Sequence, residues 1–364
     1  MKVFHVDKDI TKAETLPAAF YRSDEVFELL KETVFGESFQ WYGSVDELLP
    51  VENFVKPLSF MDGFIDEPFF LKKSADGVAC FSNVCTHRGN LIFHHEGTSK
   101  RIACGYHGRQ WKKDGTLKFM PEFSEVQNFP RACDHLKKFA TAFLGPQVFV
   151  GINPSINIES IFEVMQERIG FLPLVEFNLD TNLSKDYLVN CHWALYCDNY
   201  LEGFHIPFVH EDLNAALDYG AYKTELFENG SLQIGYSSGG DEVFHLPEGH
   251  PDHGKDVAAY YYWVYPNMMF NFYPWGLSVN VVRPISKSKT RVLFRSYVWD
   301  SSKLSTGAGA VLDKVEREDE FVVEGVHKGL QSKTYQTGRF SPTREQGVHH
   351  FHRLLAASLN DAKE

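Results

Sequence analysis

The first 37 residues have the polar and apolar spacing of short helices. Ser23 is a candidate N-cap residue, because its side chain can accept a hydrogen bond from an unpaired N–H group of the first turn. Asp24 and Glu25 follow it, and acidic residues are favoured at the positive end of a helix. Apolar residues recur from Phe27 to Leu30, so the pattern predicts a short helix here.

From about Phe39 to Pro154 the pattern changes to short apolar runs separated by turn residues. Asp-Gly pairs, which favour tight β-turns, occur at Asp62-Gly63, Asp76-Gly77 and Asp114-Gly115. Short apolar runs bounded by such turns are typical of strands. This segment therefore predicts a small antiparallel β domain.

The remainder of the chain combines helices with longer strands. We predict a helix over 155–172, strands from about 175 to 299 with a helical stretch at 191–217, and helices over 307–334 and 344–359. Because strands and helices are grouped rather than regularly alternating, the pattern indicates an α+β fold. The β domain is then an insert within an α+β domain.

Composition sets the broad class of the protein. The chain has 364 residues, of which 43% are hydrophobic and 23% charged, as in ordinary globular proteins and unlike disordered or collagen-like chains. At roughly 150 residues per domain, this length suggests about two domains. Acidic residues outnumber basic ones by 48 to 36, and a net charge of −12 argues against binding to nucleic acid.

The sequence favours a cytoplasmic protein that does not enter a membrane. Its first residues carry charges throughout and lack the continuous apolar region of a signal peptide. The most apolar stretch, Ala259 to Val282, is interrupted by Pro266 and Pro274, so it cannot form an apolar helix of ~20 residues. Six cysteines are too few for a disulfide scaffold, which leaves their thiols available as metal ligands.

Two short loops contain one cysteine and one histidine each: Cys85 with His87, and Cys104 with His107. A single zinc ion also accepts two Cys and two His, but zinc fingers group the cysteines in one loop and the histidines on a helix. One thiol and one imidazole per loop instead favour a Rieske [2Fe–2S] cluster, with both thiolates on one iron and both imidazoles on the other. The other four cysteines lack such partners, and we interpret them as structural (Cys80, Cys133, Cys191, Cys197).

A second cluster of potential ligands contains Glu202, His205 and His210. Glu202 and His205 would share a face of a helix that Pro207 ends, and His210 could then return to the same metal. Two His and one carboxylate form the facial triad of non-haem Fe(II) oxygenases, which leaves positions open for O₂ and substrate. Alone, two His near a helix end are more often structural; the upstream Rieske motif reverses this preference.

The carboxylate of that triad is expected on a later helix rich in acidic residues, most of which should form a solvated face. Asp319, Val322, Val323 and Val326 share helical spacing, which places Asp319 on the apolar face. A buried carboxylate needs a partner such as a metal ion. We therefore select Asp319 as the third ligand and expect Glu318 and Glu320 to point elsewhere.

At this point the chain resembles the α subunits of Rieske non-haem iron oxygenases over nearly its whole length. The motifs that carry the resemblance are CTHRGN (85–90), CGYHGRQW (104–111), DNYLEGFHIPFVH (198–210), EDEFVVEGVHKGL (318–330) and HHFHRLL (349–355). They are most similar to the subgroup of choline monooxygenase, glycine betaine demethylase and carnitine monooxygenase.

The resemblance implies a Rieske domain at 38–153 and a helix-grip (START/SRPBCC-like) catalytic domain formed by 1–37 and 154–364. It implies that Cys85, His87, Cys104 and His107 hold the cluster. It assigns the mononuclear iron to His205, His210 and Asp319 and makes Glu202 the electron-transfer bridge to the cluster of a neighbouring subunit. Asp198 and Asn199, at the start of the same motif, are further catalytic candidates.

The resemblance also implies partners. The chain would form a head-to-tail homotrimer, or a multiple of trimers, in which the cluster of one subunit serves the iron of the next. A separate flavin- or ferredoxin-type reductase would supply electrons from NAD(P)H.

The substrate is less constrained by sequence. Residues 260–275 are densely aromatic, and an aromatic cage could hold a quaternary ammonium group through cation–π contacts worth ~0.5–2 kcal/mol each. The alternative is that these aromatics pack a sheet face. Three functions follow: a monooxygenase acting on a methylated ammonium compound, an aromatic-ring dioxygenase, or a Rieske electron carrier. The second ligand set argues against the carrier.

Overall fold

The structure is a computed structural model that describes residues 3–239, 242–304, 306–310 and 312–361. The chain divides into two compact units. We call Phe39–Ser155 the insert unit and Met1–Ser38 together with Ile156–Glu364 the main unit. The insert unit interrupts the main unit in the sequence.

The insert unit consists of three small antiparallel sheets, with strand orders β1-β10-β9, β4-β3-β2-β5 and β6-β7-β8. Gly115 illustrates the tight turns between neighbouring strands: its φ is +85°, and a Cβ atom there would lie 2.6 Å from the Phe81 ring. The strands are β1 (Phe39–Ser44), β2 (Phe54–Phe60), β3 (Glu67–Ser74), β4 (Gly77–Ser82), β5 (Gly97–Thr98), β6 (Ile102–Ala103), β7 (Gln110–Trp111), β8 (Leu117–Phe119), β9 (Ala140–Leu144) and β10 (Gln147–Gly151), with the short helix α3 (Val45–Leu48).

The main unit contains a seven-stranded antiparallel sheet of order β11-β17-β16-β15-β14-β13-β12. Its strands are β11 (Asn178–Val189), β12 (Lys223–Phe227), β13 (Gly230–Tyr236), β14 (Val257–Val264), β15 (Met268–Tyr273), β16 (Gly276–Ser286) and β17 (Lys289–Val298). The register aligns Gln233 with Tyr261 and Tyr261 with Asn271, so these side chains lie in one cross-strand row.

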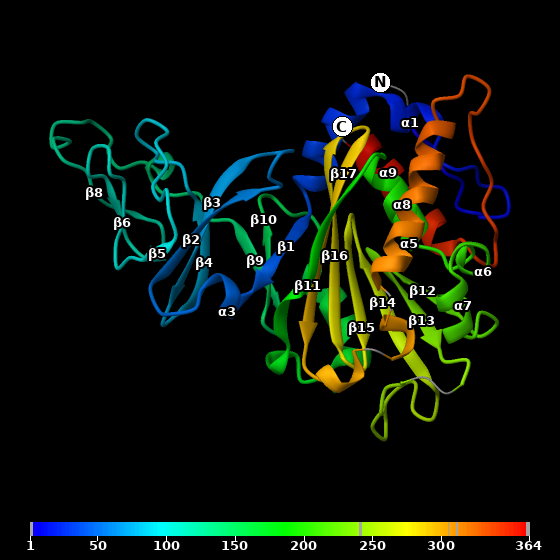
Figure 1. Cartoon of the computed structure of the whole chain (residues 1–364). Helices are drawn as coiled ribbons and strands as arrows, with labels where there is room; N and C mark the ends of the chain where they lie inside the picture. The colour runs from blue at the N-terminus through cyan, green and yellow to red at the C-terminus, as the bar shows by residue number, and fades with distance from the viewer. Residues whose placement is uncertain (1–2, 240–241, 305, 311, 362–364) are drawn as a thin grey trace. The chain divides into compact units, whose positions relative to one another are not determined.

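Helices cover this sheet (Figure 1). Helix α5 contacts β16 and also packs against α8 and α9. Ser23 caps α2 by accepting a hydrogen bond from the Val26 N–H at 3.2 Å, as predicted. The helices are α1 (Ala18–Arg22), α2 (Asp24–Leu30), α4 (Ile158–Ile169), α5 (Trp193–Tyr200), α6 (Ile206–Val209), α7 (Glu211–Ala216), α8 (Leu312–Gly329) and α9 (Gln346–Asp361).

The predicted α+β fold with an inserted antiparallel β segment is confirmed. The helix predicted over 307–334 was too long. A short 3₁₀ turn occupies Gly307–Gly309, and α8 spans Leu312–Gly329; Val311 lies outside the described residues. Among the described residues, no helix is long and apolar enough to cross a membrane.

Candidate metal centres and the adjoining pocket

The segment between α5 and α7 supplies two histidines to one site. Helix α5 ends at Tyr200, and Glu202 to His205 form a turn rather than the predicted helix. Pro207 does not end a helix but lies in the first turn of α6, where its missing N–H group leaves no hydrogen bond unmade. Gly203 fits this turn because a Cβ atom would lie 2.9 Å from the Tyr222 ring.

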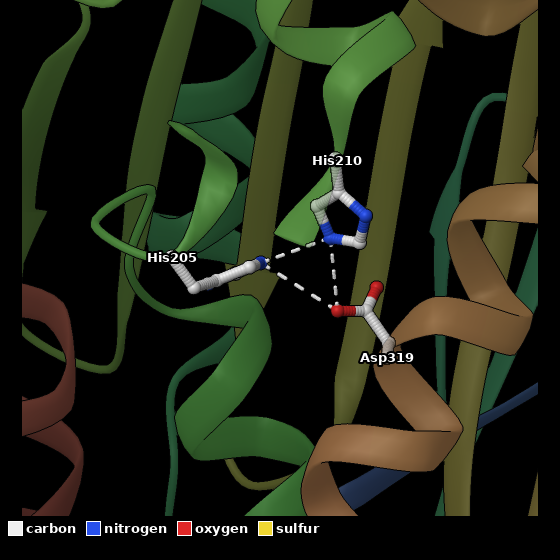
Figure 2. Close-up of side chains that lie close together, drawn as sticks. All are labelled: His205, His210 and Asp319. Atoms are coloured by element: carbon white, nitrogen blue, oxygen red, sulfur yellow. Dashed lines mark hydrogen bonds and ion pairs between the residues drawn. The ribbon is translucent and has the colours of Figure 1, made fainter. Parts of the chain in front are cut away.

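His205, His210 and Asp319 point toward one another (Figure 2), with their ligand atoms all within 4.8 Å. The His205 Nε2 and His210 Nε2 atoms are 3.2 Å apart, and Asp319 Oδ1 lies 3.5 Å and 3.0 Å from them, respectively. Bonds of about 2.1 Å at right angles to one metal ion would separate neighbouring ligand atoms by about 3 Å. The three side chains therefore fit one face of an octahedral ion.

Each histidine is oriented by a second carboxylate. Glu202 Oε1 accepts a hydrogen bond from His205 Nδ1 at 2.7 Å, and Glu318 Oε2 lies 2.7 Å from His210 Nδ1. Carboxylates at Nδ1 fix the ring tautomer and leave Nε2 available for a metal ion. This arrangement corrects our expectation that Glu318 points elsewhere.

The surrounding carboxylates favour a cation. Burial lowers the pKa of His210, but hydrogen bonds and charges from Asp319 and Glu318 outweigh this effect and raise it overall. The same negative charges attract a divalent ion. His210 is 1% exposed, so an ion there would be shielded from bulk water on the His210 side.

Helix α8 differs from its predicted polarity at two positions. Val326, placed on the apolar face by its spacing, is 45% exposed. Glu316 belongs to a segment whose acidic residues were mostly expected to be solvated, but it is 3% exposed, and Tyr196 of α5 donates a hydrogen bond to its carboxylate. The buried face of α8 thus contains Glu316, Asp319 and Val323.

The other two candidates from this motif have separate positions. Asp198 Oδ1 lies 2.9 Å from His352 Nε2 of α9, and Asp198 Oδ2 accepts a hydrogen bond from the Tyr21 hydroxyl at 3.1 Å. Asp198 therefore links α5 to α9 and α1. Asn199 lines the pocket beside the triad.

In the insert unit, the two Cys/His loops meet. His87 Nδ1 and His107 Nδ1 are 3.2 Å apart, and Cys104 Sγ accepts hydrogen bonds from Asn90 Nδ2 at 3.5 Å and from the Tyr106 N–H at 3.4 Å. Burial, and to a smaller extent the charges of His107 and nearby arginines, lower the pKa of His87, which favours the neutral imidazole that binds metals.

These four side chains do not converge on a single ion. Among the described residues, His205, His210 and Asp319 are the group of three whose ligand atoms all lie within 4.8 Å of one another. No three of the described residues in the Cys/His loops meet that limit. A tetrahedral zinc ion would require tighter convergence, since its bonds are ~2.0–2.3 Å long. The pair of imidazoles and the pair of thiols, Cys85 and Cys104, fit a two-iron cluster.

Asp134 accepts hydrogen bonds from residues in or next to both Cys/His loops. Its carboxylate accepts a hydrogen bond from Arg109 Nη2 at 2.7 Å, and Arg109 is 1% exposed. Its carbonyl oxygen accepts hydrogen bonds from Thr86 Oγ1 at 2.9 Å and Trp111 Nε1 at 3.1 Å. Both Cys/His loops are thus connected to one residue. Sequence reasoning missed Asp134, because no spacing relates it to the ligands.

The remaining cysteines differ in exposure. All six cysteines are free thiols. Cys80, Cys191 and Cys197 are buried, as expected of structural thiols, and burial raises the pKa of Cys191 to about 12. Cys133 is exposed, which does not fit the structural role that we expected for it.

A pocket opens next to the triad and is lined by five tyrosines: Tyr196, Tyr200, Tyr222, Tyr261 and Tyr273. Most of the predicted aromatic segment 260–275 packs elsewhere, because alternate residues of a strand face opposite sides. Of the aromatic residues in that segment, only Tyr261 and Tyr273 are among the described residues that line the pocket. The other three tyrosines come from α5 and the loop before β12, where sequence pattern gave no signal.

Comparison with known proteins agrees with this geometry. Residues 177–361 match the ring-hydroxylating alpha subunit (catalytic domain) family, and residues 53–130 match the Rieske [2Fe-2S] domain family. The chain is 30% identical to the chloroplastic choline monooxygenase of Arabidopsis thaliana, with 96% of this chain and 84% of that protein covered. It is 28% identical to the carnitine monooxygenase oxygenase subunit of Escherichia coli K12, with 96% of this chain and 95% of that protein covered.

A solved structure shows the same fold. The quaternary ammonium Rieske monooxygenase CntA in complex with L-carnitine superposes with a TM-score of 0.71 at 22% identity, covering 95% of this chain and 96% of that one. The chain thus belongs to the Rieske oxygenases with a ring-hydroxylating α subunit, as its motifs predicted. It is an oxidoreductase that combines a Rieske [2Fe–2S] domain with an iron-dependent oxygenase domain.

Proposed function

We propose that the protein is the oxygenase component of a monooxygenase system that hydroxylates a carbon next to nitrogen in a small methylated ammonium compound. The observation that carries this proposal is the tyrosine-lined pocket beside His205, His210 and Asp319. Tyrosine faces attract a quaternary ammonium group by cation–π contacts of ~0.5–2 kcal/mol each. The names of its choline and carnitine monooxygenase relatives support the same substrate class.

The residues of the main unit have distinct roles in this proposal. His205, His210 and Asp319 would hold a mononuclear Fe(II), which would supply reductive activation of O₂. Glu202 and Glu318 keep the two imidazoles in the metal-binding tautomer. The pocket tyrosines orient a substrate C–H bond toward the triad. One oxygen atom enters that bond, the other leaves as water, and two electrons and two protons balance the reaction.

The product depends on which carbon reacts. Hydroxylation of an N-methyl group gives a carbinolamine, which releases formaldehyde and the demethylated amine. Hydroxylation of the alcohol carbon of an ammonium alcohol gives an aldehyde hydrate. Neither outcome requires a further residue of this chain.

We assign residues 38–153 to the Rieske domain and residues 1–37 and 154–364 to the catalytic domain. Cys85, His87, Cys104 and His107 would hold the cluster, which would supply electrons one at a time. The exposure of His107 and the neighbouring Tyr106 at the surface of the insert unit supports a role of the cluster in electron transfer. The imidazole side is thus accessible to another protein chain.

We propose that Glu202 connects the two metal centres across a subunit boundary. In this chain it is hydrogen-bonded to His205, and it also lines a second pocket formed by residues of α1, α8 and α9. Glu202 therefore contacts an iron ligand on one side and an accessible hollow on the other. Asp198 and Asn199 belong to this second pocket as well, and we assign them a supporting role.

A homotrimer and a reductase complete the system. Phe208 of α6 and Phe321 of α8 are each 82% exposed on the main unit, which supports a contact with another subunit. Electrons reach the cluster from a flavin- or ferredoxin-type reductase that uses NAD(P)H. The free thiols support a reducing compartment, and we retain the cytoplasm as its location.

The test is turnover by the iron-loaded protein with a reductase, NADH and O₂ across methylated amines and simple aromatics. We expect formaldehyde or oxidised alcohol from the ammonium compounds and no diol from the aromatics. Diol formation from an aromatic, with no reaction of any ammonium compound, would instead support the ring-hydroxylating alternative.

A further inference from the structure

Glu316 is a buried carboxylate in the pocket that the proposed reaction does not use. It lies three residues before Asp319 on α8 and is 3% exposed. The Tyr196 hydroxyl donates a hydrogen bond to its Oε2 atom, whereas its Oε1 atom has no hydrogen-bond partner among the described residues. A buried acceptor without a partner is costly, so a bound ligand is the natural source of one.

No basic side chain of the described part of the protein neutralises Glu316 in the pocket. The described lining residues include neither Lys nor Arg, and the remaining titratable ones besides the tyrosines are Glu202, His205, His210 and Asp319 of the iron site. The adjacent Arg317 is turned away: its side chain is 61% exposed and lies 2.8 Å from Glu320 Oε2. Burial is the largest cause that raises the pKa of Glu316, so its neutral form is favoured without a cation beside it, and a bound cation would favour the charged carboxylate.

A second buried acceptor lies in the same pocket. Gln233 Nε2 donates to the Tyr200 carbonyl oxygen at 2.7 Å, which fixes the amide orientation, and Gln233 Oε1 has no partner among the described residues. Among the described lining residues, two buried side-chain atoms have no hydrogen-bond partner, Gln233 Oε1 and Glu316 Oε1, and both are acceptors. A ligand complementary to them brings positive charge and hydrogen-bond donors.

We propose that Glu316 is the charge-selecting residue of the pocket and that the substrate is a cation without a carboxylate, such as a trimethylammonium alcohol. This inference rests on the proposed function and narrows its substrate class. Glu316 would face the ammonium group, and Gln233 Oε1 would accept the hydroxyl proton. A trimethylammonium carboxylate would bring a negative charge toward Glu316 and Asp319 without a basic partner, which costs affinity.

The test is isothermal titration calorimetry on the anaerobic iron-loaded protein with four ligands. Choline is the cationic alcohol, 3,3-dimethylbutan-1-ol is its neutral isostere, and carnitine and glycine betaine are the carboxylates. For the wild type we expect the lowest Kd for choline. Glu316→Gln should raise the Kd of choline roughly 30-fold or more, the cost typical of losing one partner of a buried charge pair, and leave that of the isostere unchanged.

Glu324→Gln is the matched control, since Glu324 is on the same helix, accepts a hydrogen bond from Asn190 and is not among the described pocket residues. It should leave all four Kd values unchanged. The wild-type ranking needs no variant, so the inference remains testable if Glu316→Gln does not fold. If ammonium compounds bind and react, this inference alone would be overturned by either of two results. One is a lower Kd for carnitine or glycine betaine than for choline, and the other is an unchanged Kd for choline in Glu316→Gln. If no ammonium compound binds or reacts, the proposed function fails as well.

Discussion

The two candidate metal-binding regions of this protein differ in how far their histidines are exposed to solvent. In the insert unit, the Cys/His loops place His107 at the surface. In the main unit, His210 is 1% exposed and two additional carboxylates surround the triad. An electron carrier must be approached by its donor and acceptor, whereas a site that activates oxygen benefits from excluding water. The difference in exposure therefore corresponds to the difference in proposed chemistry.

The two regions also differ in how their ligands are supported. Both Cys/His loops depend on one buried residue, Asp134, whose carbonyl oxygen and carboxylate accept hydrogen bonds. In the triad, each histidine has its own carboxylate. We expect the cluster region to lose its cofactor as a unit and the triad to weaken in steps. The following variants test this comparison.

The largest effect is expected from Cys85→Ala. Losing one thiolate should remove the cluster, its broad visible absorption and all turnover, while the triad still binds one iron. Absorption spectra and iron content measure the two effects separately. Cys133→Ala, which removes an exposed thiol of the same unit, should retain the cluster. A Cys85→Ala protein with an unchanged spectrum would contradict the ligand assignment.

Removing a triad ligand should have the converse result. Asp319→Ala and His205→Ala should keep the cluster spectrum, lose the mononuclear iron and abolish oxygen-dependent product formation. The measurements are iron per chain and product under saturating reductase. Our choice of ligand would be wrong if Asp319→Ala kept iron and activity while Glu316→Ala or Glu318→Ala lost both.

Glu202→Gln tests the connection between the two regions. The amide keeps the size of the side chain but removes the charge at His205 Nδ1, so we expect both metal centres to remain and electron delivery to slow by orders of magnitude. Glu202→Asp, which retains the charge, should keep part of the activity. Single-turnover oxidation of the reduced cluster with substrate and O₂ measures this step. Wild-type kinetics in Glu202→Gln would indicate a purely structural role.

Glu318→Gln should have the smallest effect of the series. It weakens the partner of His210 Nδ1 without removing a ligand, and such changes typically cost about 10- to 100-fold in metal affinity. Competition with a chelator measures that affinity. Glu324→Gln, on the same helix but bonded to Asn190, is the control and should bind iron normally.

The features of these sites that depend on local spacing could be predicted from the sequence. Cys85 and His87, like Cys104 and His107, are neighbours in the chain, so their pairing could be predicted without a fold. Asp319 could be selected because helical periodicity reports which side of α8 is apolar. The α+β fold followed in the same way from the lengths and grouping of the apolar runs.

The parts that depend on tertiary contacts could not be predicted. Glu316 lies on the same face of α8 as Asp319, but nothing in its own segment indicates that Tyr196 of α5 donates a hydrogen bond to its carboxylate. The pocket combines Tyr261 and Tyr273 of the sheet with tyrosines from elements far away in the chain. Periodicity identifies the faces of one element, but not which faces of different elements meet.

Metal and sulfide analysis of the wild type and two variants tests the central claim that this chain carries two independent metal centres. We expect about three irons and two sulfides per chain in the wild type, from one [2Fe–2S] cluster and one mononuclear site. Asp319→Ala should lose one iron and no sulfide, and Cys85→Ala should lose both sulfides and keep one iron. One zinc ion per chain without sulfide, or joint loss of all iron in both variants, would contradict the claim.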